Sequence, residues 1–160
     1  LAIFEGAYGS DHPHTETCQG NLNNARADLE FPLHAAAKRG DVDAMRQLLD
    51  DGAEISKKKT GTTPLYCACE GGHVDAARFL LERGAKIDET SIFKGMEGVT
   101  PLHIASYGGH IEVVRLLLER GADVHLEAGG MKPMDLARQF GRNEALLDLL
   151  NEHASGVARF

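Results

Sequence analysis

A motif that recurs along the chain constrains its fold more than any other feature of this 160-residue sequence. Four segments align without gaps from a proline onward, and these prolines are spaced by 32, 37 and 32 residues. The segments are residues 32–40, 64–72, 101–109 and 133–141 (PLHAAAKRG, PLYCACEGG, PLHIASYGG and PMDLARQFG). The period predicts a solenoid, because one such unit is too thin to bury its own apolar face and must stack on its neighbours.

The third unit shows how one repeat is expected to fold. Thr100 can cap a short helix that begins at Pro101, where a missing N–H costs nothing. The glycine pair at 108–109 should end this helix, since glycine enters the left-handed region cheaply. A second helix is expected from about His110, and Gly121 should end it. Its apolar residues recur at helical spacing: Val113, Val114, Leu117 and Leu118.

These residues resemble the ankyrin repeat. The resemblance rests on Thr-Pro-Leu at 63–65, Thr-Pro-Leu-His at 100–103, the Gly-His pairs, and a closing Leu-Leu-x-x-Gly-Ala. It implies an all-α solenoid of stacked helix–turn–helix units with short β-hairpin fingers and a concave, protein-binding groove. We expect four repeats, at 31–55, 56–88, 89–125 and 126–154, followed by a tail at 155–160.

The first and fourth repeats depart from the pattern. Phe31 replaces the capping threonine of the first repeat, and the fourth departs at Lys132, Asp135 and His153. Both departures suit terminal repeats, which face solvent or another element on one side.

The segment before the repeats is expected to be a helix–turn–helix joint. Cys18, Leu22, Ala25 and Leu29 form one apolar stripe. Residues 1–5, 8–15 and 21–22 resemble the tetratricopeptide repeat (TPR) of the kinesin light chain type. The resemblance implies that residues 1–30 end a TPR-like array and cap the first ankyrin repeat. It makes His12 and His14 turn residues rather than zinc ligands, which would need more partners than this window offers.

Composition limits the function classes. The net charge of −7 disfavours nucleic acid and anionic membranes as partners. Three cysteines do not make a disulfide framework, so we expect a cytoplasmic, intracellular protein. The chain opens on Leu1 rather than Met, and we expect an excised piece of a longer protein that is monomeric as a fragment.

Candidate chemical groups have simpler structural explanations. His34 and His103 share one column of the repeat with Tyr66 and Asp135, and by resemblance they are buried hydrogen-bond ties between neighbouring loops. A single residue separates Cys67 from Cys69, whereas a zinc knuckle has two residues between its cysteines. Cys69 holds the place of a small core residue. We expect no catalytic residue, no metal site and no cofactor.

The connection between the second and third repeats is five residues longer than its neighbours. The extra residues lie within 88–96 and include Ile92, Phe93 and Met96. Apolar residues are unusual at a finger tip. Two alternatives follow: the insertion folds back over the stack, or it offers an apolar anchor to a partner.

The family pattern also implies which positions face the groove, and Tyr107, Phe140, Met96 and Met131 would form an aromatic and apolar patch there. Aromatic and arginine side chains commonly anchor interfaces. With the insertion included, the candidate partner-binding residues are Lys38, Arg39, Lys59, Thr60, Thr62, Glu70, Ile92, Phe93, Met96, Glu97, Val99, Tyr107, Met131, Gln139 and Phe140.

The sequence therefore predicts a non-enzymatic scaffold or adaptor that binds another protein through the groove and fingers. The alternative is a regulatory module attached in cis to an enzyme or channel in a longer chain. The repeat frame does not specify the partner's identity.

Overall fold

The computed structural model describes residues 30–141 and 143–156, where short helices follow one another in pairs. Each predicted proline begins a helix in these residues. The helices are α3 (Pro32–Arg39), α4 (Val42–Asp50), α5 (Pro64–Glu70), α6 (Val74–Glu82), α7 (Pro101–Gly108), α8 (Ile111–Glu119), α9 (Pro133–Leu136) with its π-helical continuation η1 (Ala137–Gly141), and α10 (Glu144–Ala154).

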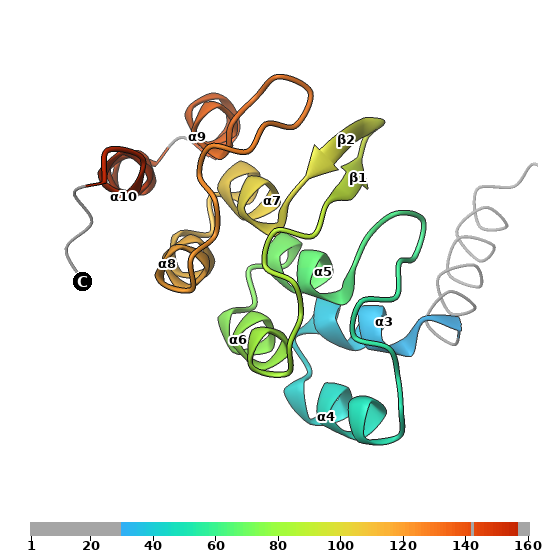
Figure 1. Cartoon of the computed structure of the whole chain (residues 1–160). Coiled ribbons are helices and arrows are strands. Elements are labelled where there is room, and N and C mark those ends of the chain that lie inside the picture. Colours follow the sequence, from blue (N-terminus) through green and yellow to red (C-terminus); the bar gives the residue numbers. More distant parts are fainter. Residues whose placement is uncertain (1–29, 142, 157–160) are drawn as a thin grey trace, which may run out of the picture. The chain divides into compact units, whose positions relative to one another are not determined.

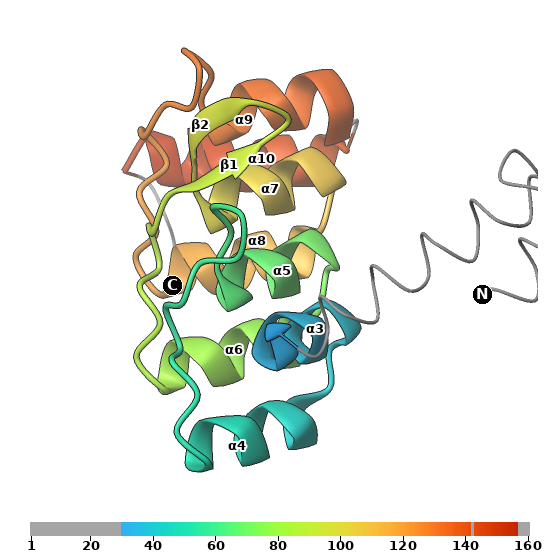
Figure 2. The ribbon, with the colours of Figure 1, turned by 90° about the vertical axis from the view of Figure 1, so that its right-hand side faces the viewer.

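The chain divides into two units, Leu1–Pro32 and Leu33–Phe160, and helices α4 to α10 lie in the second. Helices α5, α7 and α9 contact one another in succession and form an inner row, while α4, α6, α8 and α10 form an outer row (Figures 1 and 2). The repeats thus stack as a helical solenoid, as the period predicts.

The core runs along the stack between these rows. The outer helix α8 buries the stripe that was predicted from its spacing, including Val113, Val114 and Leu117 at 0% exposure. The inner helix α7 begins after the Thr100 cap and ends against Gly109 in the left-handed region, as predicted. Cys69 is also fully buried, which confirms its role as a small core residue.

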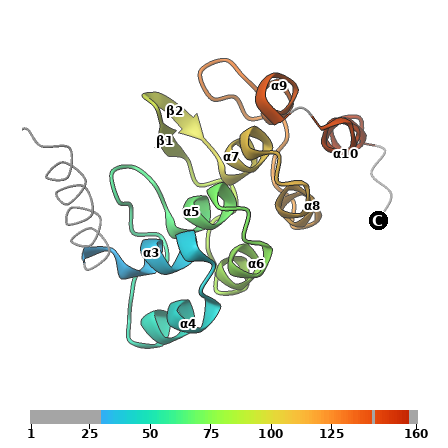
Figure 3. The same cartoon turned by 180° about the vertical axis from the view of Figure 1, so that it is seen from behind.

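Fingers connect successive repeats on the side of the inner helices (Figures 1 and 3). The first and third close through single bridges, Lys59 with Thr62 and Ala128 with Met131. The middle finger contains strands β1 (Ser91–Phe93) and β2 (Met96–Val99). Its pairing passes from Phe93↔Met96 to Ser91↔Val99, so one strand advances by one residue more than the other. This bulge places one extra residue on the second strand.

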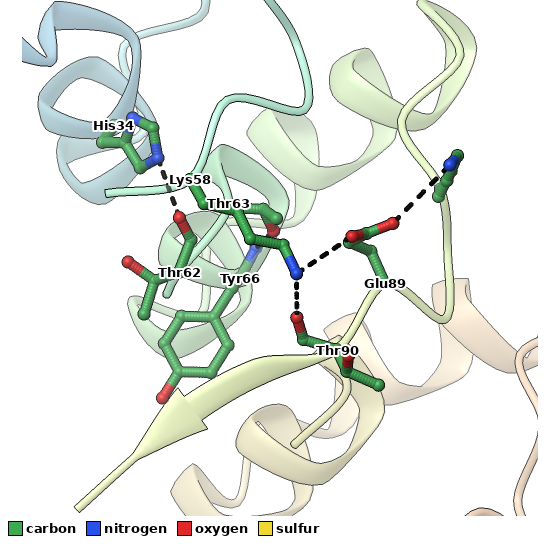
Figure 4. Close-up of polar contacts among 8 residues, drawn as sticks. His34, Lys58, Thr62, Thr63, Tyr66, Glu89 and Thr90 are labelled. Carbon is green, nitrogen blue, oxygen red and sulfur yellow. Dashed lines mark hydrogen bonds and ion pairs between the residues drawn. The ribbon is translucent and has the colours of Figure 1, made fainter. Parts of the chain in front are cut away.

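Histidine side chains connect neighbouring repeats in two ways. His34 Nε2 lies 3.0 Å from the Thr62 carbonyl oxygen (Figure 4), and His103 Nε2 lies 3.1 Å from that of Met131. Each bond joins an inner helix to the following finger, which confirms the predicted loop tie. His73 and His110 connect in the opposite direction, from the start of an outer helix to the inner helix of the preceding repeat. Their partners are carbonyls near the end of that inner helix, at Lys38 for His73 and at Glu70 for His110.

Each terminal repeat replaces one of these histidines by an aspartate that bonds within its own unit. Asp135 accepts a hydrogen bond from the Lys132 N–H at 2.9 Å, which matches the contact of Thr100 N–H with His103 Nδ1. Asp41 stands in the first repeat where later repeats have His73 and His110, and its side chain caps α4. A carboxylate satisfies the helix start, whereas the longer imidazole of a histidine also reaches a neighbouring repeat.

The TPR-like joint predicted for residues 1–30 falls almost wholly outside the described residues. It therefore stays a prediction, as do the repeat boundaries.

Gly72 provides a test of the histidine packing. A Cβ at Gly72 would lie 2.6 Å from His110 Nδ1, whereas a Cβ at Gly84 would meet no atom within 4 Å; both glycines have positive φ. We expect Gly84→Ala to lower the free energy of unfolding by about 1 kcal/mol through backbone strain alone. Gly72→Ala should lower it by about 2–4 kcal/mol, because the His110 ring must also move and lose its bond to Glu70. Urea unfolding measures both, and equal losses would contradict this role for His110.

Candidate functional site

A cavity of about 310 Å³ opens between the middle and third fingers, above the inner helix α7 and the segment α9–η1. Most of its wall is apolar or aromatic. We call it the aromatic cavity, and its lining is Phe93, Lys94, Met96, Val99, His103, Ile104, Tyr107, Met131, Leu136, Gln139 and Phe140. A concave apolar site with a few polar groups is typical of binding sites.

Three aromatic rings from three different segments meet at this cavity. The ring centroids of Phe93 and Tyr107 are 5.2 Å apart in an edge-on arrangement, and those of Tyr107 and Phe140 are 4.9 Å apart. Tyr107 is half-buried between the other two, while Phe140 is 47% exposed. Such ring pairs are more favourable than the area they bury would account for. The three rings therefore form a rigid wall in which Phe140 is the exposed ring.

The middle finger is fixed on both sides, which positions Phe93. On one side Lys58 Nζ lies 3.1 Å from Glu89 Oε1 and donates to the Thr90 carbonyl at 2.9 Å (Figure 4). The Ile92 N–H also donates to the carbonyl of Gly61 in the first finger. On the other side a Cβ at Gly129 would lie 3.1 Å from Met96 Cγ, so the middle finger touches the third.

The strand alternation in this finger separates residues that were predicted to act together. Phe93 and Met96 line the aromatic cavity, whereas Ile92 faces the opposite side with Glu97. Successive side chains of a strand point to opposite faces. There they line a more polar recess of about 300 Å³ with Lys58, Gly61, Thr90, Ser91 and Gly98. The insertion was expected either to fold back over the stack or to offer an apolar anchor to a partner. Phe93 folds back, because it packs on Tyr107.

Lys94 also belongs to the site, although the sequence alone did not identify it as a functional residue. It occupies the two-residue turn Lys94–Gly95 with φ of 50° and 80°, the left-handed geometry of a type I′ hairpin. Its Nζ lies 5.0 Å from the Phe93 ring centroid and 5.5 Å from that of Tyr107, within cation–π range. It also donates to the Tyr107 hydroxyl at 3.3 Å. The Lys-Gly pair between two apolar residues was the available sequence signal.

The wide turn η1 places Gln139 and Phe140 over the cavity. A Cβ at Gly141 would lie 2.8 Å from the Ser106 carbonyl oxygen of α7, so only glycine permits this close approach. A π-helical turn at the end of α9 is unusual, and such turns occur frequently at functional sites.

His103 forms a polar part of the wall and is held in one neutral form. Its Nε2–H donates to the Met131 carbonyl, and its Nδ1 accepts from the Thr100 N–H at 3.2 Å. Burial lowers the pKa of His103 below its ordinary value of 6.5, although the Met131 bond and the charge of Asp88 act in the other direction. Nδ1 also lies 2.7 Å from Thr100 Oγ1, so the capping residue holds this nitrogen through two contacts.

The cavity gathers seven of the predicted partner-binding residues: Phe93, Met96, Val99, Tyr107, Met131, Gln139 and Phe140. Val99 is only 1% exposed and belongs to the core beneath the cavity, because the bulged strand turns it inward. It therefore contributes only to the floor of the cavity, and its role as a partner contact stays a prediction. Ile92 and Glu97 lie at the polar recess. The remainder lie outside both hollows: Lys38, Arg39, Lys59, Thr60, Thr62 and Glu70.

The cysteines offer no reactive site among the described residues. Burial raises the pKa of the Cys67 thiol to about 11 and also raises that of Cys69, so neither forms the nucleophilic thiolate readily. Within residues 30–141 and 143–156 no group of three or more His, Cys, Asp or Glu side chains is placed to hold a metal ion. In the same ranges no helix has the length and apolar character that crossing a bilayer requires.

Comparison with known families defines the class. A model of ankyrin repeats (3 copies) matches residues 7–91, just over half of the chain, and a second model of ankyrin repeats (many copies) matches residues 68–118. The chain therefore belongs to the ankyrin repeat family, whose repeats generally mediate protein–protein interaction. No curated protein matches it.

The buried histidines lead to a prediction for stability against pH. Burial lowers the folded-state pKa of both His34 and His103, so below 6.5 the unfolded chain binds protons that the folded chain does not. The free energy of unfolding should fall as the pH is lowered, by up to about 1.4 kcal/mol per histidine at one unit below that value. Denaturant titrations measure this between about pH 7.5 and 5.5. The double variant His34→Gln/His103→Gln should show a flatter profile, and an unchanged slope would contradict the assignment.

Proposed function

We propose that this segment is a non-enzymatic adaptor that binds a partner protein at the aromatic cavity and the adjoining fingers. The observation that carries the proposal is the ring cluster, in which Phe140 remains 47% exposed beside the partly buried Tyr107. Protein interfaces are enriched in aromatic anchors of this kind, and such residues dominate binding energy when they are desolvated.

The surroundings of the cavity support binding by a preformed surface. The Lys58 contacts, the Tyr107 ring and the third finger all restrain the middle finger. The aromatic wall therefore needs little ordering when a partner arrives, and preorganisation lowers the cost of association.

The volume of the cavity favours side chains of a protein over a large cofactor. About 310 Å³ lies at the lower end of the range for ligand pockets, and the cavity opens between two fingers. It holds one or two apolar side chains, and the neighbouring finger surface remains for the rest of the partner. His103 is the imidazole in the wall, and both of its ring nitrogens are already engaged. We therefore propose recognition rather than catalysis.

The proposal predicts that one exposed ring is essential and that a comparable residue on the other face is not. Among the described residues, Phe140 and Ile92 are the large exposed hydrophobic ones, at 47% and 45%, but only Phe140 lines the aromatic cavity. We expect Phe140→Ala to weaken partner binding by about 2 kcal/mol or more, as for an interface hot spot. Ile92→Ala should leave binding nearly unchanged.

The measurement is quantitative affinity capture from cell extract, with isothermal titration calorimetry on each captured protein. Because both side chains are exposed, thermal melting should confirm that both variants remain folded. Equal binding by Phe140→Ala and wild type would remove the cavity as the binding site, and selective loss in Ile92→Ala would move the site to the polar recess.

A further inference from the structure

We propose that the aromatic cavity recognises linear peptide segments in which a large apolar side chain has Asp or Glu within two positions of it. The inference rests on the proposed protein-binding function and specifies the chemistry of the ligand. It is carried by one side chain, Lys94, which is the sole charged residue of the cavity lining in the described part of the chain.

The ammonium group of Lys94 has unused hydrogen-bonding capacity. It carries three donors, and its hydrogen bond to the Tyr107 hydroxyl is long and joins a neutral acceptor. No carboxylate within residues 30–141 and 143–156 forms an ion pair with it. Lys94 is exposed, so a ligand carboxylate reaches it without displacing a partner.

The position of the charge determines how the ligand would be oriented. The floor of the cavity contains Val99, Ile104 and Leu136, which are buried and apolar. A carboxylate placed there would lose its water without finding a partner. The apolar side chain therefore occupies the floor, while the carboxylate stays beside Lys94 at the finger tip.

The same geometry disfavours a cationic ligand. Aromatic rings attract cations, but the rings of Phe93 and Tyr107 already have the Lys94 ammonium within 5.5 Å of their centroids. A second cation would meet this charge at close range. The rings thus hold the lysine in place, and the lysine sets the preferred sign of the ligand.

The turn that carries Lys94 makes a conservative test possible. Both turn residues have positive φ, and asparagine adopts this conformation more readily than lysine. Lys94→Asn therefore removes the charge while favouring the hairpin. Arg78→Gln is the matched control, because Arg78 is exposed on the outer helix α6 and its loss changes the net charge equally.

The experiment selects random linear peptides by phage display on the full 160-residue chain and on the variants Lys94→Asn, Arg78→Gln and Phe140→Ala. Wild type and Arg78→Gln should enrich peptides with a large apolar residue and a neighbouring Asp or Glu. Lys94→Asn should retain the apolar preference and lose the acidic one. A peptide selected on wild type should bind Lys94→Asn about three- to fivefold more weakly, and added salt should reduce that difference.

Charge reversal provides the decisive cross-check. Lys94→Glu should bind the selected peptide poorly and recover affinity for the same peptide with its acid changed to Lys. Wild-type selections without an acidic preference, or the same preference in Lys94→Asn, would overturn the inference while leaving the protein-binding function intact. Equal enrichment on wild type and Phe140→Ala would overturn both, and binding of apolar small molecules alone would count against a peptide ligand.

Discussion

The rest of the structure depends on the stacking of each helix pair on the next. In a pair such as α7 and α8, apolar residues of each helix face the other helix and also the neighbouring pairs. One repeat alone would therefore leave part of this apolar surface in water. Apolar packing has little directional preference, and it does not by itself set the offset between repeats. The histidine bonds supply that information, because each joins a helix end in one repeat to a particular carbonyl in a neighbouring repeat.

This arrangement links the core to the aromatic cavity. His103 caps its own helix through Nδ1 and holds the third finger through Nε2, so one imidazole determines the distance between α7 and Met131. The middle finger lies between the first and third fingers, and its residues Phe93 and Met96 pack against the core, whereas Ile92 and Lys94 are exposed. The cavity thus results from an inserted segment placed on a regular frame, and its walls come from parts of the chain that are separate in sequence.

The regular part of the molecule could be predicted from sequence because its signals are local. Proline with a preceding threonine, paired glycines and the spacing of Val113, Val114 and Leu117 each fix a helix or its end without reference to distant residues. The histidine column was also predictable, since the repeat itself aligns His34 with His103.

The inserted finger could not be predicted in the same way. The inserted finger contains a bulge, and the position of the bulge decides which side chains face the groove. The sequence therefore did not show that Val99 lies at the buried floor of the cavity, or that strand alternation separates Ile92 from Phe93. Lys94 was missed because its role depends on ring positions that only the folded chain brings together.

The backbone at Lys94 shows how local and global preferences differ at this site. The third finger closes with two glycines, Gly129 and Gly130, where the middle finger has a lysine in the left-handed region. Side chains other than glycine, asparagine and aspartate fit that conformation poorly, so this hairpin tip, like Thr60 in the first finger, is a point of local frustration. Conflicts of this kind tend to occur at functional positions. Sequences of related arrays can therefore be searched for the same conflict, a bulky cation where the turn itself favours glycine.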